Sequence, residues 1–130
     1  MSSITVSASV YSLCDGSNGA CGDCNNNAME AAWANLANHG NYFTSSCVCN
    51  GFNGENLPQF SCGQVVTVKD ICNSVSGTIT ISDSDNPGGC LCDHDCNGYY
   101  SVLRTMDLTE AAMYYFTGTT YDLIGVTVTY

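Results

Sequence analysis

The chain has 130 residues, of which only two are Lys or Arg and 12 are Asp or Glu, so its formal net charge at pH 7 is -10. Affinity for nucleic acid and for anionic lipid comes from Lys and Arg, so this charge argues against both partners, whereas a neutral polysaccharide is not penalised. With 45% hydrophobic and 11% charged residues, the chain lacks the composition of a disordered segment, and its length suits one domain over residues 1–130.

The cysteine content is high and even in number, with ten in the chain. Because cytosolic thiols are kept reduced, this density favours a secreted, extracellular protein with a disulfide framework, and no metal or cofactor is expected. Spacing alone does not assign the pairs. No apolar stretch is long enough to cross a membrane. We expect every cysteine to be bridged: Cys14, Cys21, Cys24, Cys47, Cys49, Cys62, Cys72, Cys90, Cys92 and Cys96.

Two elements are predicted in the first third of the chain. Residues 4–11 alternate and are rich in β-branched types, which predicts a strand. Residues 28–38 predict a helix capped by Asn27 and ended by Gly40, with Trp33 directed into the core. A loop rich in Gly, Asn and Cys lies between these two elements.

The later part of the chain predicts strands at 64–69, 78–82 and 124–130 and a second helix at 107–116, which Thr105 or Asp107 would cap. Long loops at 41–61 and 83–100 separate these elements, and the first contains the turn dipeptide Asn50-Gly51. Several short strands with two short helices and bridged loops indicate a small β-barrel.

Short motifs occur in a fixed order along nearly the whole chain: 8–11 (Ala-Ser-Val-Tyr), 19–22 (Gly-Ala-Cys-Gly), 62–63 (Cys-Gly), 78–83 (Thr-Ile-Thr-Ile-Ser-Asp), 107–113 (Asp-Leu-Thr-Glu-Ala-Ala-Met) and 125–130. This order resembles that of expansins and the related fungal loosenins. The resemblance implies an all-β fold, a disulfide-rich six-stranded double-psi β-barrel with two short helices. The chain departs from the family where Thr105-Met106 replaces its His-Phe and where its Cys-Pro after Asp83 is missing.

The resemblance also implies a site. Asp107 matches the aspartate that donates a proton to the leaving sugar in related enzymes, and Asp83 matches a neighbour in the same groove. An acid near a helix start also has a purely structural explanation, so both interpretations of Asp107 stay open. Sugar faces stack on tyrosines, and Tyr11, Tyr99 and Tyr100 are expected to bind substrate, with Tyr42 and Tyr121 also near loops or strand ends. Packing roles are expected instead for Tyr114, Tyr115 and Phe116.

Hydrolysis of a glycoside normally needs two carboxylates. The predicted first strand contains none, and the first acidic residue of the chain is Asp15. The main expectation is therefore a secreted protein that binds, and loosens, neutral polysaccharide without hydrolysis. One alternative is a glycanase or lytic transglycosylase with Asp107 as the catalytic acid. Another is a non-enzymatic interaction protein: an effector, a protease inhibitor or a self-assembling component, for which a homo-oligomer is compatible with the low charge.

The densest cluster of reactive residue types is Cys90-Leu-Cys-Asp-His-Asp-Cys96. Thiolates with His94 would suit zinc, but in an oxidising compartment disulfides are strongly favoured. A loose oxygen site built from Asp83, Asp85, Asp93 and Asp95 is left open.

Overall fold

The structure is a computed structural model that describes residues 1–11, 18–40, 42–43, 46–85, 90–96 and 100–130. Six strands form its closed barrel, in the order β1 (Ser3–Val10), β11 (Ile124–Thr129), β7 (Val65–Asp70), β8 (Ser76–Ser84), β4 (Glu30–Trp33) and β10 (Tyr100–Leu108). Pairing of β1 with β10 closes the ring, so the barrel wall has no open edge.

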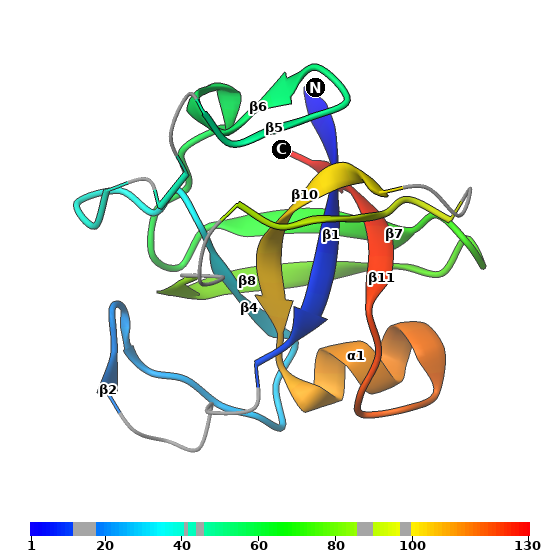
Figure 1. Ribbon diagram of the computed structural model, residues 1–130. Coiled ribbons are helices and arrows are strands. Elements are labelled where there is room, and N and C mark those ends of the chain that lie inside the picture. Colours follow the sequence, from blue (N-terminus) through cyan, green and yellow to red (C-terminus); the bar gives the residue numbers. More distant parts are fainter. Residues whose placement is uncertain (12–17, 41, 44–45, 86–89, 97–99) are drawn as a thin grey trace.

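Two strand pairs of the barrel, β1–β10 and β4–β8, are parallel, and the other neighbours are antiparallel. Parallel neighbours need long crossover connections, which is why the chain passes through the long loops predicted from the sequence. The expected small double-psi barrel is confirmed. Figure 1 shows β1 and β10 side by side in its wall, with α1 (Glu110–Thr117) below one end.

Short elements decorate the barrel. A hairpin of β2 (Asn18–Gly19) and β3 (Gly22–Asp23) and a second of β5 (Val48–Cys49) and β6 (Phe52–Asn53) lie outside the main sheet. The strand β9 (Cys92–His94) pairs with β10, and a 3-10 turn, η1 (Gly54–Asn56), follows β6. In Figure 1 the β5–β6 hairpin lies near both termini, at the end of the barrel opposite α1.

Four strand predictions are confirmed with small shifts at their ends: those at 4–11, 64–69, 78–82 and 124–130. In β7 alternate side chains are buried, as period-2 alternation predicts. The barrel interior is filled mainly by these strands together with β10, and its fully buried side chains include Val6, Val66, Val68, Ile79, Ile81, Met106, Leu108, Val126 and Val128.

The helix predicted at 28–38 is wrong. Its centre is the strand β4, which lies between β8 and β10 and is buried through Ala31, Ala32 and Trp33. A strand buried on both faces has a continuous apolar pattern that periodicity does not separate from a helix, so tertiary packing decides. The core placement of Trp33 is confirmed, since its Nε1 donates to the Pro58 carbonyl over 2.9 Å and its ring stacks on Phe60.

The second helix begins at Glu110, three residues after its predicted start at Asp107, because β10 continues through Leu108. The cap is Thr109, whose hydroxyl accepts from the Ala112 N–H over 3.2 Å, rather than Thr105 or Asp107. The described residues therefore contain one short α-helix instead of two, and part of the predicted loop 83–100 is strand. Phe116 is buried as expected, and Tyr115, although half exposed, packs edge-on against Phe116 and donates its hydroxyl to the Ser76 carbonyl. Tyr114 is exposed, which corrects the packing role given to it.

Four disulfides are described: Cys21–Cys62, Cys47–Cys90, Cys49–Cys92 and Cys72–Cys96. Cys24 is also disulfide-bonded, while Cys14 lies outside the described residues. No cysteine of the described segments is free, which confirms the disulfide framework. Within the same segments, no helix has the length and apolar character that crossing a bilayer requires.

Candidate functional site

The two aspartates singled out from the sequence lie in one row across the barrel wall. Asp107 of β10 and Asp83 of β8 both pair with Ala32 of the strand between them, and Asp107 pairs on its other side with Ser9 of β1. At the usual spacing of neighbouring strands, the Asp83 and Asp107 backbones are about 10 Å apart. We call Ser9, Asp107, Asp83 and the adjoining Asp85 the acid row.

Asp83 is enclosed by its own chain. Its carboxylate accepts hydrogen bonds from the Tyr11 hydroxyl, from the Ala20 N–H over 2.7 Å and from the Ser84 N–H over 2.8 Å. The β2–β3 hairpin lies so close that a Cβ at Gly19 would stand 2.3 Å from Asp83 Oδ2. The Gly-Ala-Cys-Gly motif therefore covers this carboxylate, which leaves Asp83 only 5% exposed.

Asp85 is the member of the row that the sequence placed only in a loose oxygen site, without a role beside Asp107. It follows β8, its N–H donates to the Trp33 carbonyl over 3.0 Å, and its side chain is buried. Burial first, then the charge of Asp107 and a hydrogen bond with that residue, raise the pKa of Asp85 to about 9, against the opposing charge of Arg104. At neutral pH Asp85 is therefore a neutral carboxylic acid, and its buried Oδ2 has no hydrogen-bond partner among the described residues.

Asp107 is the partly exposed member. Its Oδ1 accepts from the Ser9 hydroxyl, and its other close partner is the Asp85 carboxyl group. A glycosidase flanks the scissile bond with two accessible carboxyl groups. Asp83 and Asp85 are both buried, so the acid row presents one accessible acid, Asp107.

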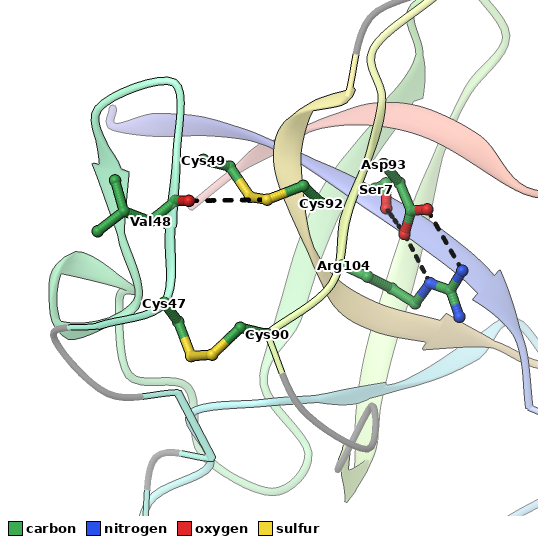
Figure 2. The surroundings of a disulfide bond; sticks show 8 residues. All are labelled: Ser7, Cys47, Val48, Cys49, Cys90, Cys92, Asp93 and Arg104. Carbon is green, nitrogen blue, oxygen red and sulfur yellow. Dashed lines mark hydrogen bonds and ion pairs between the residues drawn. A yellow bond between two sulfur atoms is a disulfide. The ribbon is translucent and has the colours of Figure 1, made fainter.

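An ion pair lies beside the row. Arg104 of β10 contacts Asp93 of β9 through two nitrogens, Nε to Oδ2 over 2.7 Å and Nη2 to Oδ1 over 3.4 Å, and the Ser7 hydroxyl donates to the same Oδ2 over 3.2 Å. Figure 2 shows the three side chains converging. The hydrogen bond to Asp93, and then the charges of Asp93, Asp107 and Asp85, raise the pKa of Arg104 further despite its partial burial.

A cavity of about 500 Å³ opens next to this ion pair. Residues of the barrel wall and of the segment before β11 line the cavity: Ser9, Val10, Arg104, Tyr121, Asp122 and Leu123. Asp83, Asp85 and Asp107 are not among these lining residues. The cavity meets the acid row only at Ser9, whose hydroxyl donates to Asp107.

The tyrosines expected to bind substrate, so far as the structure describes them, differ in their surroundings. Tyr11 is partly buried with its hydroxyl on Asp83, while Tyr42 and Tyr121 are exposed, and Tyr121 borders the cavity. Tyr100 opens β10 in register with His94, and Tyr99 lies outside the described residues. The substrate-binding roles of Tyr11, Tyr99, Tyr100, Asp83 and Asp107 stay predictions.

The cluster from Cys90 to Cys96 is structural. Its three cysteines are all in disulfides, His94 Nε2 lies 3.0 Å from the Leu123 carbonyl oxygen, and Asp95 accepts from the Ser101 hydroxyl over 2.7 Å. With Asp93 bound to Arg104, no thiolate and no free carboxylate pair is left for a metal. No group of three His, Cys, Asp or Glu side chains within the described segments is arranged to hold a metal ion.

The fold and this site define a class: a small β-barrel cross-linked by disulfides, with a buried acid row in its wall. Among solved structures the chain is similar to the Streptomyces papain inhibitor, with 20% identity and a TM-score of 0.50 over 98% of this chain and 93% of that one. No family model matches the sequence, and no curated protein matches it. The structural likeness confirms the barrel fold, whereas membership of the expansins is not confirmed.

Proposed function

We propose that the protein is a non-enzymatic extracellular protein that binds a protein partner, and that this partner is a cysteine protease, which it inhibits. The observation that carries the proposal is the likeness to a papain inhibitor over almost the full length of both chains. The match spans 98% of this chain and 93% of the inhibitor.

The chemistry of the acid row supports a role without catalysis. Asp83 is held by three donors and covered by the β2–β3 hairpin, and Asp85 is neutral and buried. Neither group reaches a substrate without local opening of the chain. These bonds tie β1, β8 and the β2–β3 hairpin together, so the row stabilises the barrel.

The disulfide framework supports an inhibitory and secreted role. Disulfides form and persist in oxidising compartments, which favours secretion. Cross-links also restrict the loops before binding, so less conformational entropy is lost when a partner is bound. A rigid loop surface is what a protein needs to occupy a protease cleft without being degraded there.

The proposal is tested by titrating papain with the purified protein and measuring residual hydrolysis of a small peptide substrate. We expect inhibition of papain that approaches one-to-one stoichiometry, and no inhibition of a serine, an aspartic or a metalloprotease at the same concentration. Protein with reduced and alkylated cysteines is the control and should be inactive, because the framework is lost. Full papain activity at a large excess of the folded protein would contradict the proposal.

Polysaccharide binding, the main expectation from the sequence, is the alternative outcome. The cavity beside Arg104, with Tyr121 on its rim, is the feature that favours it, since sugars stack on tyrosine. Sedimentation with insoluble cellulose, chitin, xylan and peptidoglycan, together with a reducing-sugar assay, distinguishes the two. Retention on one of these polymers without protease inhibition would favour the polysaccharide reading.

A further inference from the structure

We propose that the β5–β6 hairpin, residues 47–53, is the segment that enters the substrate cleft of the protease. This inference rests on the proposed function and assigns it to a surface remote from the acid row. The end of β10 that carries Asp107 leads into α1, whereas the hairpin lies at the opposite end of the barrel (Figure 1). We call this segment the braced hairpin.

The tip of the braced hairpin is a two-residue turn. Only Asn50 and Gly51 connect β5 to β6, and both have positive φ angles, 50° and 82°. Two such residues define the tight turn whose twist matches the flanking strands, and Asn-Gly is its preferred sequence. Both residues are exposed, so the tip carries little bulk into a cleft.

Two neighbouring disulfides hold the hairpin. Cys47, which precedes β5, is joined to Cys90, and Cys49 of β5 is joined to Cys92 at the start of β9, so the first half of the hairpin is fixed to residues 90–92. In Figure 2 the two disulfides lie one above the other between these segments, and the Val48 side chain points away from them. The Val48 carbonyl oxygen also lies 3.7 Å from Cys92 Sγ, on the braced side.

The two faces of the hairpin differ. Cys49 is buried and Phe52, its cross-strand partner, packs partly against the core, whereas Val48 is 50% exposed and pairs with Asn53. The outward face thus presents one apolar side chain in extended backbone. Protease-type clefts bind extended chains through backbone hydrogen bonds and take alternate side chains into pockets, which is the pattern that Val48 offers.

The charge of the segment fits the same role. Residues 47–54 read Cys-Val-Cys-Asn-Gly-Phe-Asn-Gly and contain no charged side chain, although the chain as a whole has 12 acids. An uncharged segment enters a cleft without the large free energy needed to remove water from an unpaired charge. The apolar Val48 and the amides of the tip are therefore suited to burial by a partner.

The two disulfides also explain why the braced hairpin, once inserted in the cleft, would inhibit the protease instead of being cleaved as a substrate. If a protease cut a peptide bond between Cys47 and Cys49, both new ends would stay attached through separate disulfides to Cys90 and Cys92. The ends would remain in place, so the cut fragment could not diffuse away and resealing would be favoured by proximity. A hairpin held in this way occupies a cleft and is not consumed.

The test is papain inhibition by the full chain with Val48→Glu, with Val65→Glu as the matched control. Val65 is an exposed valine on β7, 58% exposed against 50% for Val48, so both variants place the same charge on a comparable surface. We expect Val48→Glu to raise the inhibition constant about 30-fold or more, as burial of an unpaired charge at an interface centre does, and Val65→Glu to leave it within about two-fold. Val48→Ala, which adds no charge, should give a smaller rise.

The outcomes separate the two proposals. If wild type inhibits papain and both glutamate variants inhibit equally well, the braced hairpin is not the inserted segment and the proposed function stands. If wild type does not inhibit papain, both proposals fail. Thermal unfolding of each variant shows whether a loss of inhibition accompanies loss of the fold, and a Val48→Ala protein that melts as wild type does but inhibits less supports the assignment.

Discussion

Asp85, which follows β8, and Asp107 of β10 lie on either side of β4; burial first, then the charge of Asp107 and a hydrogen bond with that residue, raise the pKa of Asp85 from 3.8 to about 9. The folded protein keeps this proton at pH values where the unfolded chain has released it. The resulting contribution to folding stability is fully present below the unfolded pKa and is lost as the pH rises towards 9. Alkaline conditions should therefore weaken the barrel through this pair.

The change Asp85→Asn tests this. Asparagine keeps a neutral donor towards Asp107 but has no proton to lose, so the variant should resemble wild type below the unfolded pKa of 3.8 and become progressively more stable than wild type as the pH rises from there to about 9. The measurement is the free energy of unfolding by denaturant at several pH values. The control Asp122→Asn removes an exposed acid and should follow wild type throughout. Parallel curves for wild type and Asp85→Asn would show that Asp85 does not hold a proton in the fold.

The sequence predicted the barrel because strands buried on one face, such as β7, show clear alternation of buried and exposed residues. The number of cysteines also indicated a disulfide framework without any knowledge of the pairs. It failed at β4 and at the end of β10. Ala31 to Trp33 form a run buried between two strands, and residues such as Leu108 lie where a strand passes directly into a helix. Local pattern carries no information on burial from both faces, so the alanine-rich segment was assigned to the wrong element.

For the site, the strand register places Asp83 and Asp107 opposite the same residue, Ala32, and their binding roles stay predictions. The sequence named Asp85 only as part of a loose oxygen site, because its interaction with Asp107 and Arg104 depends on residues that are distant in sequence. The braced hairpin was visible only as the Asn50-Gly51 turn, because its significance depends on disulfide pairs that spacing does not assign. A signal was present in the matched Cys-x-Cys spacings at 47–49 and 90–92, which place two cross-links in register.

Gly19 is expected to be intolerant of any side chain. Its Cβ would stand 2.3 Å from Asp83 Oδ2, so Gly19→Ala must displace either the β2–β3 hairpin or a carboxylate held by three donors. We expect a loss of about 1–3 kcal/mol in the free energy of unfolding, as for overpacking elsewhere. The control combines it with Asp83→Ala, which removes the atoms that the new methyl group meets. Equal effects of Gly19→Ala in both backgrounds would place the conflict elsewhere.

Arg104 is expected to stabilise β9 against β10 through Asp93. Arg104→Ala leaves the nearly buried Asp93 carboxylate with only the Ser7 hydroxyl of the partners described above, so the free energy of unfolding should fall by about 2 kcal/mol. Asp93→Asn in the same protein should recover part of this loss, because the unpaired charge is removed with its partner. Thermal melts of the two single variants and the double variant measure the coupling, and simple additivity would rule out a direct interaction.

Removal of Cys49–Cys92 and removal of Cys72–Cys96 should differ in opposite ways in their effects on stability and on inhibition. Cys49–Cys92 lies next to Cys47–Cys90 and closes nearly the same loop, with the same sequence separation of 43, so its removal releases little additional chain entropy. Cys72–Cys96 has no such neighbour among the described disulfides, and its separation of 24 corresponds to up to about 3.5 kcal/mol in the chain-entropy treatment. The pair Cys72→Ser and Cys96→Ser should therefore destabilise the fold more than Cys49→Ser with Cys92→Ser.

Inhibition should follow the reverse order, because Cys49–Cys92 is one of the two bonds that hold the braced hairpin, whereas Cys72–Cys96 lies outside it. Without it the tip is held at Cys47 alone, the outward face of Val48 is no longer preorganised, and a cut after residue 48 would free a new chain end. We expect the inhibition constant for papain to rise about ten-fold or more, with cleavage in the hairpin visible by mass spectrometry under reducing conditions. The Cys72 and Cys96 variant should inhibit as wild type does below its melting temperature. If inhibition instead followed melting temperature in both variants, rigidity of the whole barrel, and not of this hairpin, would account for it.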